Sequence, residues 1–458
     1  MSGTYNQGGE GAPIENLEQL SAYLAKGCKP ESDFRIGTEH EKFGFALNDH
    51  TPLAYDGDGP TVLKMLQGLQ RFGWDAIVEA GYIVALKRDG ASITLEPGGQ
   101  FELSGAPLEN VHQTCGEVNK HLREVREVAD EIGAGFLGLG FSPKWSLEET
   151  PMMPKARYGL MKAYMPKVGT LGHQMMFRSA TVQTNLDFSD EADMAKKFRV
   201  SLALQPVATA LFANSPFADK GLNGFLSYRA HIWTDTDRHR TGMLPFVFED
   251  GFGFENYVNW ALDVPMYFVK RKGAYLDATG LNFRDFLEGK LDILPGEKPV
   301  ISDWEDHLST LFPEVRLKTF LEMRGADSGA WDSLCALPAF WVGLMYDGSA
   351  LDAAWDLVKG WNADEREQLR IDAAKLGLKA PAPGGGTMQE LARQVLKISR
   401  SGLNARARLN GHGENEALFL DELDDIVKSG RTRAEDLIAR FEGEWNGSIE
   451  PVFTECAY

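Results

Sequence analysis

Alternating polar and apolar positions predict a β-strand at residues 35–45, RIGTEHEKFGF. Strict alternation places Glu39 and Glu41 on the same face of an extended chain, together with Phe43 and Phe45. Side chains that follow one another on one face are roughly 7 Å apart, so this pair can hold one hard cation or two neighbouring ones. For this stretch alone, a solvent-facing strand edge with two glutamates of no special role is the simpler interpretation.

The same polar face recurs on other predicted strands, and this recurrence favours a site. The segments are SITLEPGGQFELSG, TVQTNLDF and FLEMRGAD, and the first contains a Pro-Gly-Gly interruption that predicts a tight hairpin or bulge. Their polar faces carry Thr94, Glu96, Gln100 and Glu102, then Thr181, Gln183, Asn185 and Asp187, then Glu322 and Arg324. We therefore expect one concave, acidic sheet face. Crowded carboxylates repel one another and take up protons, so cations are their natural partners.

Apolar residues at steps of three and four predict helices between and after these strands. They cover residues 16–26, 61–72, 111–132 and 190–213, and, after residue 331, residues 351–361, 388–398, 418–427 and 432–441. We expect an α+β fold in which residues 1–330 form a catalytic body of sheet and helices. Residues 331–458 are then a helical C-terminal support packed on the same body. Residues 1–12 are polar and Gly-rich, which predicts a mobile tail.

Two basic segments have open interpretations. Residues 142–173 lack clear periodicity and predict an irregular cover over a site, with Tyr158 and Tyr164 among its aromatic residues, although a plain surface loop fits equally well. In RAHIWTDTDRHRTG, alternation would place Arg229 and Trp233 on one side, with Arg240 in the turn behind them. This cluster is either a solvated loop or a clamp for a carboxylate or phosphate.

Composition narrows the possible partners. The chain has 66 acidic and 47 basic residues and a formal charge of −19, which argues against nucleic acid or an anionic membrane as partner. No apolar run is long enough for a membrane helix, and the first twenty residues show no targeting pattern, so we expect a cytoplasmic protein. A monomer is compatible with the sequence, which leaves the oligomeric state open. The four cysteines are far apart in the sequence and form no CxxC, so we expect neither a zinc site nor a disulfide. We expect Cys115 to pack in the apolar core.

Common nucleotide motifs are missing from the sequence. GAGFLG at residues 133–138 formally matches GxGxxG, but it runs from a predicted helix into a strand, the reverse of a dinucleotide fingerprint. No phosphate loop, HExxH or GxSxG motif occurs. Divalent ions in an acidic trough rimmed by Arg and Lys still suit phosphoryl transfer from a nucleoside triphosphate, on a fold other than the P-loop one.

Longer motifs resemble a known family. IGTEHEKFGF, ITLEPGGQFELSGAP, TVQTNLDFS, HIWTDTDRHRTGMLPFVFEDGFGFE and FPEVRLKTFLEMRGAD are similar to the plant-type glutamate-cysteine ligases and their proteobacterial members, and the likeness covers nearly the whole chain. The resemblance implies a glutamine-synthetase-like fold, a curved antiparallel sheet funnel surrounded by helices. It also implies that ATP activates glutamate as γ-glutamyl phosphate, which cysteine converts to γ-glutamylcysteine in the first step of glutathione biosynthesis.

The resemblance also implies roles for individual residues. Magnesium would be held by Glu39, Glu41, Glu96, Glu102 and Glu322, and the catalytic residues would be Arg324 and Lys318. Substrates would be bound by Arg229, Trp233, Arg240, Tyr158, Tyr164 and Gln183, with Arg229, Trp233 and Arg240 fixing the charged ends of the amino acid and Tyr158 or Tyr164 closing over cysteine. The alternatives are a glutamate ligase for another amine and a non-catalytic, metal-dependent binding protein.

One departure from the plant members affects regulation. They carry a cysteine pair that couples oxidation to assembly, and the matching segments here have Ala278 and Ile293 instead. We therefore expect a bacterial member without a transit peptide, whose oligomeric state thiol oxidants do not change through an internal disulfide.

Overall fold

Strand β1 (Ile36–Ala46) lies at the centre of a nine-stranded antiparallel sheet in the computed structural model, which describes residues 8–458. The strand order is β14-β15-β7-β1-β5-β4-β3-β2, and β6 pairs with the far end of β1. The other strands are β2 (Asp75–Glu79), β3 (Tyr82–Arg88), β4 (Ala91–Leu95), β5 (Phe101–Ser104), β6 (Ala134–Leu137), β7 (Thr181–Leu186), β14 (Val315–Leu317) and β15 (Leu321–Asp327). Residues 1–7 of the predicted polar tail lie outside the described residues.

The strand register brings the predicted polar faces together. Glu41 lies opposite Glu102 of β5, and Glu39 lies opposite Gln183 of β7. On the next strand, Glu322 lies opposite Asn185. Paired residues of an antiparallel sheet point to the same face, so these side chains form one continuous polar surface. The predicted α+β fold with an antiparallel sheet is confirmed.

The Pro-Gly-Gly interruption forms the tight connection between β4 and β5. Gly99 adopts φ +83°, a left-handed conformation that favours glycine. A Cβ atom on Gly98 would lie 2.1 Å from the carbonyl oxygen of Phe177, so only glycine fits there. The close turn pairs Thr94 of β4 with Glu102 of β5, and β5 in turn places Glu102 opposite Glu41 of β1.

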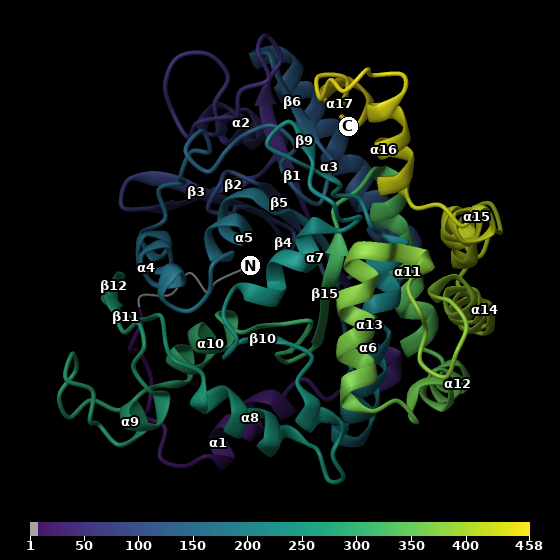
Figure 1. Ribbon diagram of the computed structural model, residues 1–458. Coiled ribbons are helices and arrows are strands. Elements are labelled where there is room, and N and C mark those ends of the chain that lie inside the picture. The colour runs from purple at the N-terminus through teal and green to yellow at the C-terminus, as the bar shows by residue number, and fades with distance from the viewer. Residues whose placement is uncertain (1–7) are drawn as a thin grey trace.

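Helices cover the sheet and enclose a large apolar core. The longer ones are α1 (Glu18–Ala25), α2 (Val62–Leu69), α3 (Val111–Ile132), α6 (Glu191–Leu211), α8 (Phe254–Asp263), α10 (Ile301–Ser309), α11 (Trp331–Met345), α12 (Gly348–Val358), α13 (Ala363–Leu376), α14 (Met388–Arg406), α15 (Asp421–Ser429) and α16 (Arg433–Glu442). Figure 1 shows α11 to α15 along one side of the molecule, with α16 and α17 (Val452–Glu455) at the top beside α3. Helix α11 packs against β1 and β7, and α6 packs against β15.

Helix α3 ends where the sequence predicts. Gly133 takes a left-handed conformation at its C-terminus, and β6 begins at the next residue. GAGFLG therefore joins a helix to a strand, and the rejection of a dinucleotide fingerprint is confirmed.

Two predictions of local structure are wrong. Residues 142–173 are not irregular throughout, because they contain α4 (Ala156–Tyr164), and α5 (Gly172–Arg178) begins at the end of this segment. Residues 229–233 are not extended: α7 (Tyr228–Ile232) is followed by a 3₁₀ turn, η4 (Trp233–Asp235). The Ser227 hydroxyl accepts a hydrogen bond from the Ala230 N–H and caps α7, a local signal that outweighs the short alternation.

The absence of a disulfide is also wrongly predicted. Cys115 of α3 and Cys335 of α11 form a disulfide with Cα atoms 5.4 Å apart. The two cysteines are separated by 220 residues, and they meet because α3 and α11 pack against each other. Cys28 and Cys456 are free thiols. Cys115 is buried as predicted, but as half of a cross-link between two helices.

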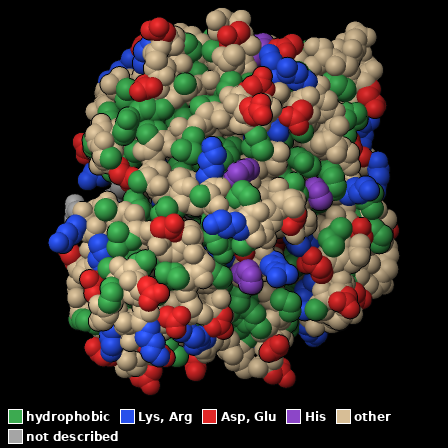
Figure 2. Space-filling view, turned by 60° about the vertical axis from the view of Figure 1, so that its left-hand side comes forward, with side chains coloured by type: hydrophobic (Ala, Val, Ile, Leu, Met, Phe, Trp, Pro, Cys, Tyr) green, Lys and Arg blue, Asp and Glu red, His purple; other side chains and the backbone are tan. Residues whose placement is uncertain are grey.

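Charged side chains are unevenly distributed over the surface. In Figure 2, Lys, Arg and His side chains lie around the middle of the face shown, and Asp and Glu are most frequent along its lower edge.

Within residues 8–458, no single helix is both long and apolar enough to cross a membrane. Helices α11 and α12 pass such a test only when taken together, and an 89° bend separates them.

Candidate active site

Four carboxylates are buried on the polar face of the sheet: Glu39 and Glu41 of β1, Glu96 at the β4 end and Glu102 of β5. One cavity is lined by two of them and by residues from several other elements, and its lining includes Glu41, Glu96, Gln183, Arg229, Trp233 and Arg324. Residues that span nearly 300 positions of the sequence therefore converge on one place.

Crowding of these carboxylates changes their acidity. Burial raises the pKa of Glu41 well above its usual value, and the nearby charges of Glu96 and Glu102 raise it further. Burial also raises the pKa of Glu39, and Glu322 adds to the effect. Glu39 and Glu41 therefore bind protons more tightly than isolated carboxylates do, and a cation would relieve the same repulsion.

Glu39 keeps one oxygen available. Its Oε1 accepts a hydrogen bond from Asn185 Nδ2 at 3.0 Å, whereas its buried Oε2 has no hydrogen-bond partner within residues 8–458. Glu41 Oε2 accepts from the Thr181 backbone N–H at 3.0 Å. In the described part of the chain, no three His, Cys, Asp or Glu side chains are close enough together to form a ready-made metal site.

Glu322 is held by positive charges. Its carboxylate accepts hydrogen bonds from Arg316 at 2.5 and 2.9 Å, and Arg324 Nη1 lies 3.1 Å away. Lys318 Nζ lies 3.8 Å from the same carboxylate. Although burial opposes it, Arg316, Lys318 and Arg324 hold the pKa of Glu322 well below its usual value. Glu322 is an anion at neutral pH and is already paired, unlike Glu39.

Arg229 has the donors that a substrate anion needs. Its Nη2 donates to the Arg324 carbonyl oxygen at 2.9 Å, which fixes the guanidinium. Its Nε and Nη1 are buried and have no acceptor among the described residues. Trp233 lies 5.9 Å from this guanidinium, and its buried indole N–H is also without an acceptor in residues 8–458. A buried donor that is unpaired within residues 8–458 is costly, and an acceptor atom placed in this cavity would remove that cost.

Arg324 is oriented by a neighbouring strand. Its Nη1 donates to Gln183 Oε1 at 2.8 Å, so two residues that were predicted separately, one on β15 and one on β7, are in contact. Lys318 is partly buried beside this group, and the loss of solvent together with the charge of Arg316 lowers its pKa. The structure thus brings Arg324, Lys318 and Gln183 together with the carboxylates.

Three predicted substrate residues do not line this cavity. Arg240 is fully buried and donates to Asp237, to Thr310 and to the Pro265 carbonyl oxygen. Tyr158 is also fully buried, and its hydroxyl donates to the Leu95 carbonyl oxygen. Tyr164 packs against Tyr267 in the apolar core. Nothing in these contacts supports their substrate-binding roles, which stay predictions.

Asp327 is a buried residue that the sequence does not reveal as important. Its carboxylate accepts from the hydroxyls of Ser215 and Ser227 at 2.7 Å each, and from the Asn214 backbone N–H at 2.8 Å. Ser227 caps α7, and the Arg229 N–H donates to Ser215 Oγ, so Asp327 fixes the base of the helix that presents Arg229. Arg316 is also missed as a partner of Glu322, although it is one short step upstream in the sequence.

A larger cavity of about 600 Å³ lies elsewhere and shares none of these residues. We place the chemistry at the sheet face because the crowded carboxylates and the unpaired arginine donors are there.

Comparison with known proteins places the chain in a class of ligases that join a carboxylate to an amine. The fold is similar to that of a glutamate-cysteine ligase from Francisella tularensis, solved in complex with AMP, with a TM-score of 0.53 and 11% sequence identity over 93% of this chain and 89% of that one. Residues 35–455 match the model of glutamate-cysteine ligase family 2 (GCS2), and the chain belongs to this family.

Curated relatives agree with this assignment. The chain is 58% identical to "Glutamate--cysteine ligase, chloroplastic" of Arabidopsis thaliana over 96% of this chain and 83% of the relative. It is 56% identical to "Glutamate--cysteine ligase B, chloroplastic" of Oryza sativa subsp. japonica over 96% and 87% of the two chains. The relatives' names contradict the expectation of a cytoplasmic protein, since they refer to chloroplastic enzymes. The expectation of a bacterial member stays a prediction.

Proposed function

We propose that this protein uses ATP and magnesium to join the γ-carboxylate of glutamate to the amine of cysteine, giving γ-glutamylcysteine, the first step of glutathione biosynthesis. Family membership supports the reaction. The observation that carries the site assignment is the convergence of four buried carboxylates with the unpaired donors of Arg229 on one sheet face.

The donor set fits a hard divalent cation. Glu39 and Glu41 offer carboxylate oxygens beside Glu96 and Glu102, and oxygen is the ligand that magnesium prefers. Two observations support this: Glu39 Oε2 has no hydrogen-bond partner within residues 8–458, and burial together with the charges of Glu96 and Glu102 raises the pKa of Glu41. Bound magnesium would neutralise triphosphate charge there. Glu322 is a weaker candidate ligand than the sequence suggests, because Arg316 and Arg324 already occupy its oxygens.

The residues of the chain have separate tasks in this reaction. We assign Arg229 and Trp233 to the charged end of the amino acid, because their free N–H groups match a carboxylate. A γ-carboxylate oxygen of glutamate attacks the terminal phosphorus of ATP, and ADP leaves. The amine nitrogen of cysteine then attacks the acyl carbon, phosphate leaves and the nitrogen loses a proton. Arg324, fixed by Gln183, stabilises the negative charge that develops on the transferred phosphoryl oxygens.

A coupled assay tests the proposal. Protein with ATP, magnesium, glutamate and cysteine should release ADP and γ-glutamylcysteine in equal amounts, and chelation of magnesium should stop both. Glu41→Gln should lower turnover about a hundredfold or more, since it removes a charge from the cation site. Glu148→Gln, an exposed glutamate outside this cavity, is the matched control. Faster ADP release with other amines than with cysteine, or full activity of Glu41→Gln, would contradict the proposal.

A further inference from the structure

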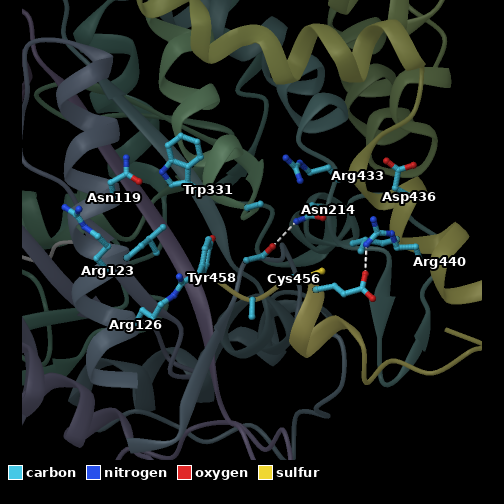
Figure 3. Close-up of a pocket in the computed structure, with 16 residues that line it drawn as sticks. Asn119, Arg123, Arg126, Asn214, Trp331, Arg433, Asp436, Arg440, Cys456 and Tyr458 are labelled. Carbon is cyan, nitrogen blue, oxygen red and sulfur yellow. Dashed lines mark hydrogen bonds and ion pairs between the residues drawn. The ribbon is translucent and has the colours of Figure 1, made fainter. Parts of the chain in front are cut away.

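A second cavity, of about 600 Å³, lies between α3, the start of α11, α16 and the last residues of the chain. This size is typical of small-molecule sites. Figure 3 shows Asn119, Arg123 and Arg126 on the α3 side, Trp331 and Tyr458 near the middle, and Arg433, Asp436 and Arg440 on the α16 side. The wall therefore combines cationic side chains with aromatic rings.

Most charges around this cavity are already neutralised by neighbours. Arg433 pairs with Asp332 and Glu422, and Arg440 pairs with Glu455. Asp436 pairs with Arg431, which is outside the lining. The Cys456 thiol is neutral, because burial and nearby Glu455 raise its pKa to about 12. The acidic groups of the wall thus have cationic partners of their own.

Arg123 and Arg126 are different. Both are exposed, both line the cavity, and neither has an ion pair or a hydrogen bond within residues 8–458. In Figure 3 the Arg126 side chain extends toward Tyr458. Two arginines without an ion pair in residues 8–458 at one cavity are notable in a chain whose formal charge is −19, because the net charge of the chain disfavours anions.

The aromatic part of the cavity wall is also open to a ligand. Trp331 is 42% exposed, and its ring lines the cavity at the first turn of α11. Below it, the Tyr458 hydroxyl donates to the Gly329 carbonyl oxygen. Opposite, Asn214 Nδ2 donates to the carbonyl oxygens of Gly138 and Ser328 at 3.0 Å each. These hydrogen bonds give the cavity a fixed floor, and the Cys115–Cys335 disulfide, one turn from Asn119 and from Trp331, joins α3 to α11.

We propose that this cavity binds a small organic anion that combines a planar ring with a phosphate or carboxylate group. The ring packs against Trp331, and Arg123 and Arg126 bind the anionic group through their guanidinium forks. The site is separate from the proposed active site, and its occupancy does not depend on the reaction assigned above.

Ligand-detected ¹⁹F NMR with 4-fluorophenyl phosphate tests this proposal. The Arg229→Lys variant should bind the probe as the wild type does, because Arg229 lies at the sheet face and does not line this cavity. The probe should bind with one-to-one stoichiometry. The Arg123→Ala/Arg126→Ala variant should weaken binding about tenfold or more, and Trp331→Ala should weaken it about fivefold. Lys120→Ala is the matched control, since Lys120 is an exposed cation of α3 that does not line the cavity, and its affinity should stay within about twofold of the wild type.

Two further probes separate the ring from the charge. 4-Fluorobenzyl alcohol, which lacks the anion, and inorganic phosphate, which lacks the ring, should each bind at least about tenfold more weakly than 4-fluorophenyl phosphate. If 4-fluorobenzyl alcohol bound as tightly as 4-fluorophenyl phosphate, the cavity would be a plain apolar pocket. If inorganic phosphate did so, it would be a plain anion site. Either result would overturn the proposal. Weaker binding of the probe by Arg229→Lys, or unchanged affinity in the double-arginine variant, would also overturn it.

Discussion

Arg316 and Glu322 form a fully buried, two-pronged ion pair across the β14–β15 hairpin, with the Arg316 Nε atom 2.5 Å and the Nη2 atom 2.9 Å from the carboxylate oxygens. Arg316 also donates to the carbonyl oxygens of Ser309 and Leu311 at 2.9 Å each. The pair therefore joins the edge of the sheet to the residues that follow α10, directly beside Arg324.

Breaking this pair should cost both stability and activity. Glu322→Gln leaves a buried guanidinium without its counter-charge, so we expect a loss of about 3–5 kcal/mol in the free energy of unfolding. Turnover should fall about a hundredfold or more, because Arg324 loses the anion that orients it. Urea unfolding and ADP release measure the two effects. Normal turnover in a folded Glu322→Gln protein would show that the pair has no part in catalysis.

Arg229→Lys should weaken glutamate binding. Lysine keeps the charge but lacks the planar fork whose free Nε and Nη1 donors face the cavity, so the KM for glutamate should rise about tenfold or more. The KM for ATP should change little. Steady-state kinetics with each substrate varied in turn measure the difference, and equal changes in both KM values would argue against a glutamate-specific role.

Asp327→Asn should act through the position of Arg229. The carboxylate holds Ser215 and Ser227, which fix the start of α7, and an amide cannot accept from both hydroxyls and from the Asn214 N–H with the same oxygens. We expect a higher KM for glutamate and a loss of about 1–3 kcal/mol in stability. Asp327→Glu is the informative comparison, since it keeps the acceptor chemistry. If all loss of activity followed from unfolding, kinetics at low temperature would be normal.

His307 should contribute to acid sensitivity. Burial lowers its pKa from 6.5 to about 4, and Nε2 lies 2.8 Å from the Ala261 carbonyl oxygen, to which the neutral ring donates. His307 therefore binds a proton more readily in the unfolded chain than in the folded one. The stability that neutral His307 contributes to the fold is full above pH 6.5 and is lost as pH falls from 6.5 to about 4. Over this pH range the contribution of His307 to the free energy of unfolding changes by about 3 kcal/mol. His307→Gln should remove this pH dependence, as measured by urea unfolding of both proteins across that range, and parallel pH curves would contradict the assignment.

The disulfide should stabilise the protein. Cys115 and Cys335 close a loop of 220 residues, so Cys335→Ser should lower the free energy of unfolding by about 2–5 kcal/mol. Reduction of the wild type should have a similar effect, and Cys28→Ser, at a free thiol, should have little. Two free thiols at positions 115 and 335 in unreduced protein, found by mass spectrometry, would rule out the bridge. The expectation that oxidants leave the oligomeric state unchanged is a separate prediction.

Alternation in the sequence was enough to identify the strands of the site and the face on which their polar residues lie. Strand side chains alternate with a period of two, so Glu39 and Glu41, or Glu322 and Arg324, share a face in any sheet that they join. The family motifs indicated the reaction, the ligation of glutamate to cysteine. Local signals also located α3 and α6 closely, namely the apolar stripe of α3 and the capping residues Asn110 and Asp190.

The tertiary structure alone decided which of these residues meet. Strand order and register place Glu41 beside Glu102 and Gln183 beside Arg324, and they also bring Cys115 to Cys335 across 220 residues. Pairing between distant segments depends on the packing of the whole core, which no local pattern encodes. For the same reason, the sequence could not show that Arg316 neutralises Glu322, that Arg240 is fully engaged within the core, or that Arg229 keeps two donors free.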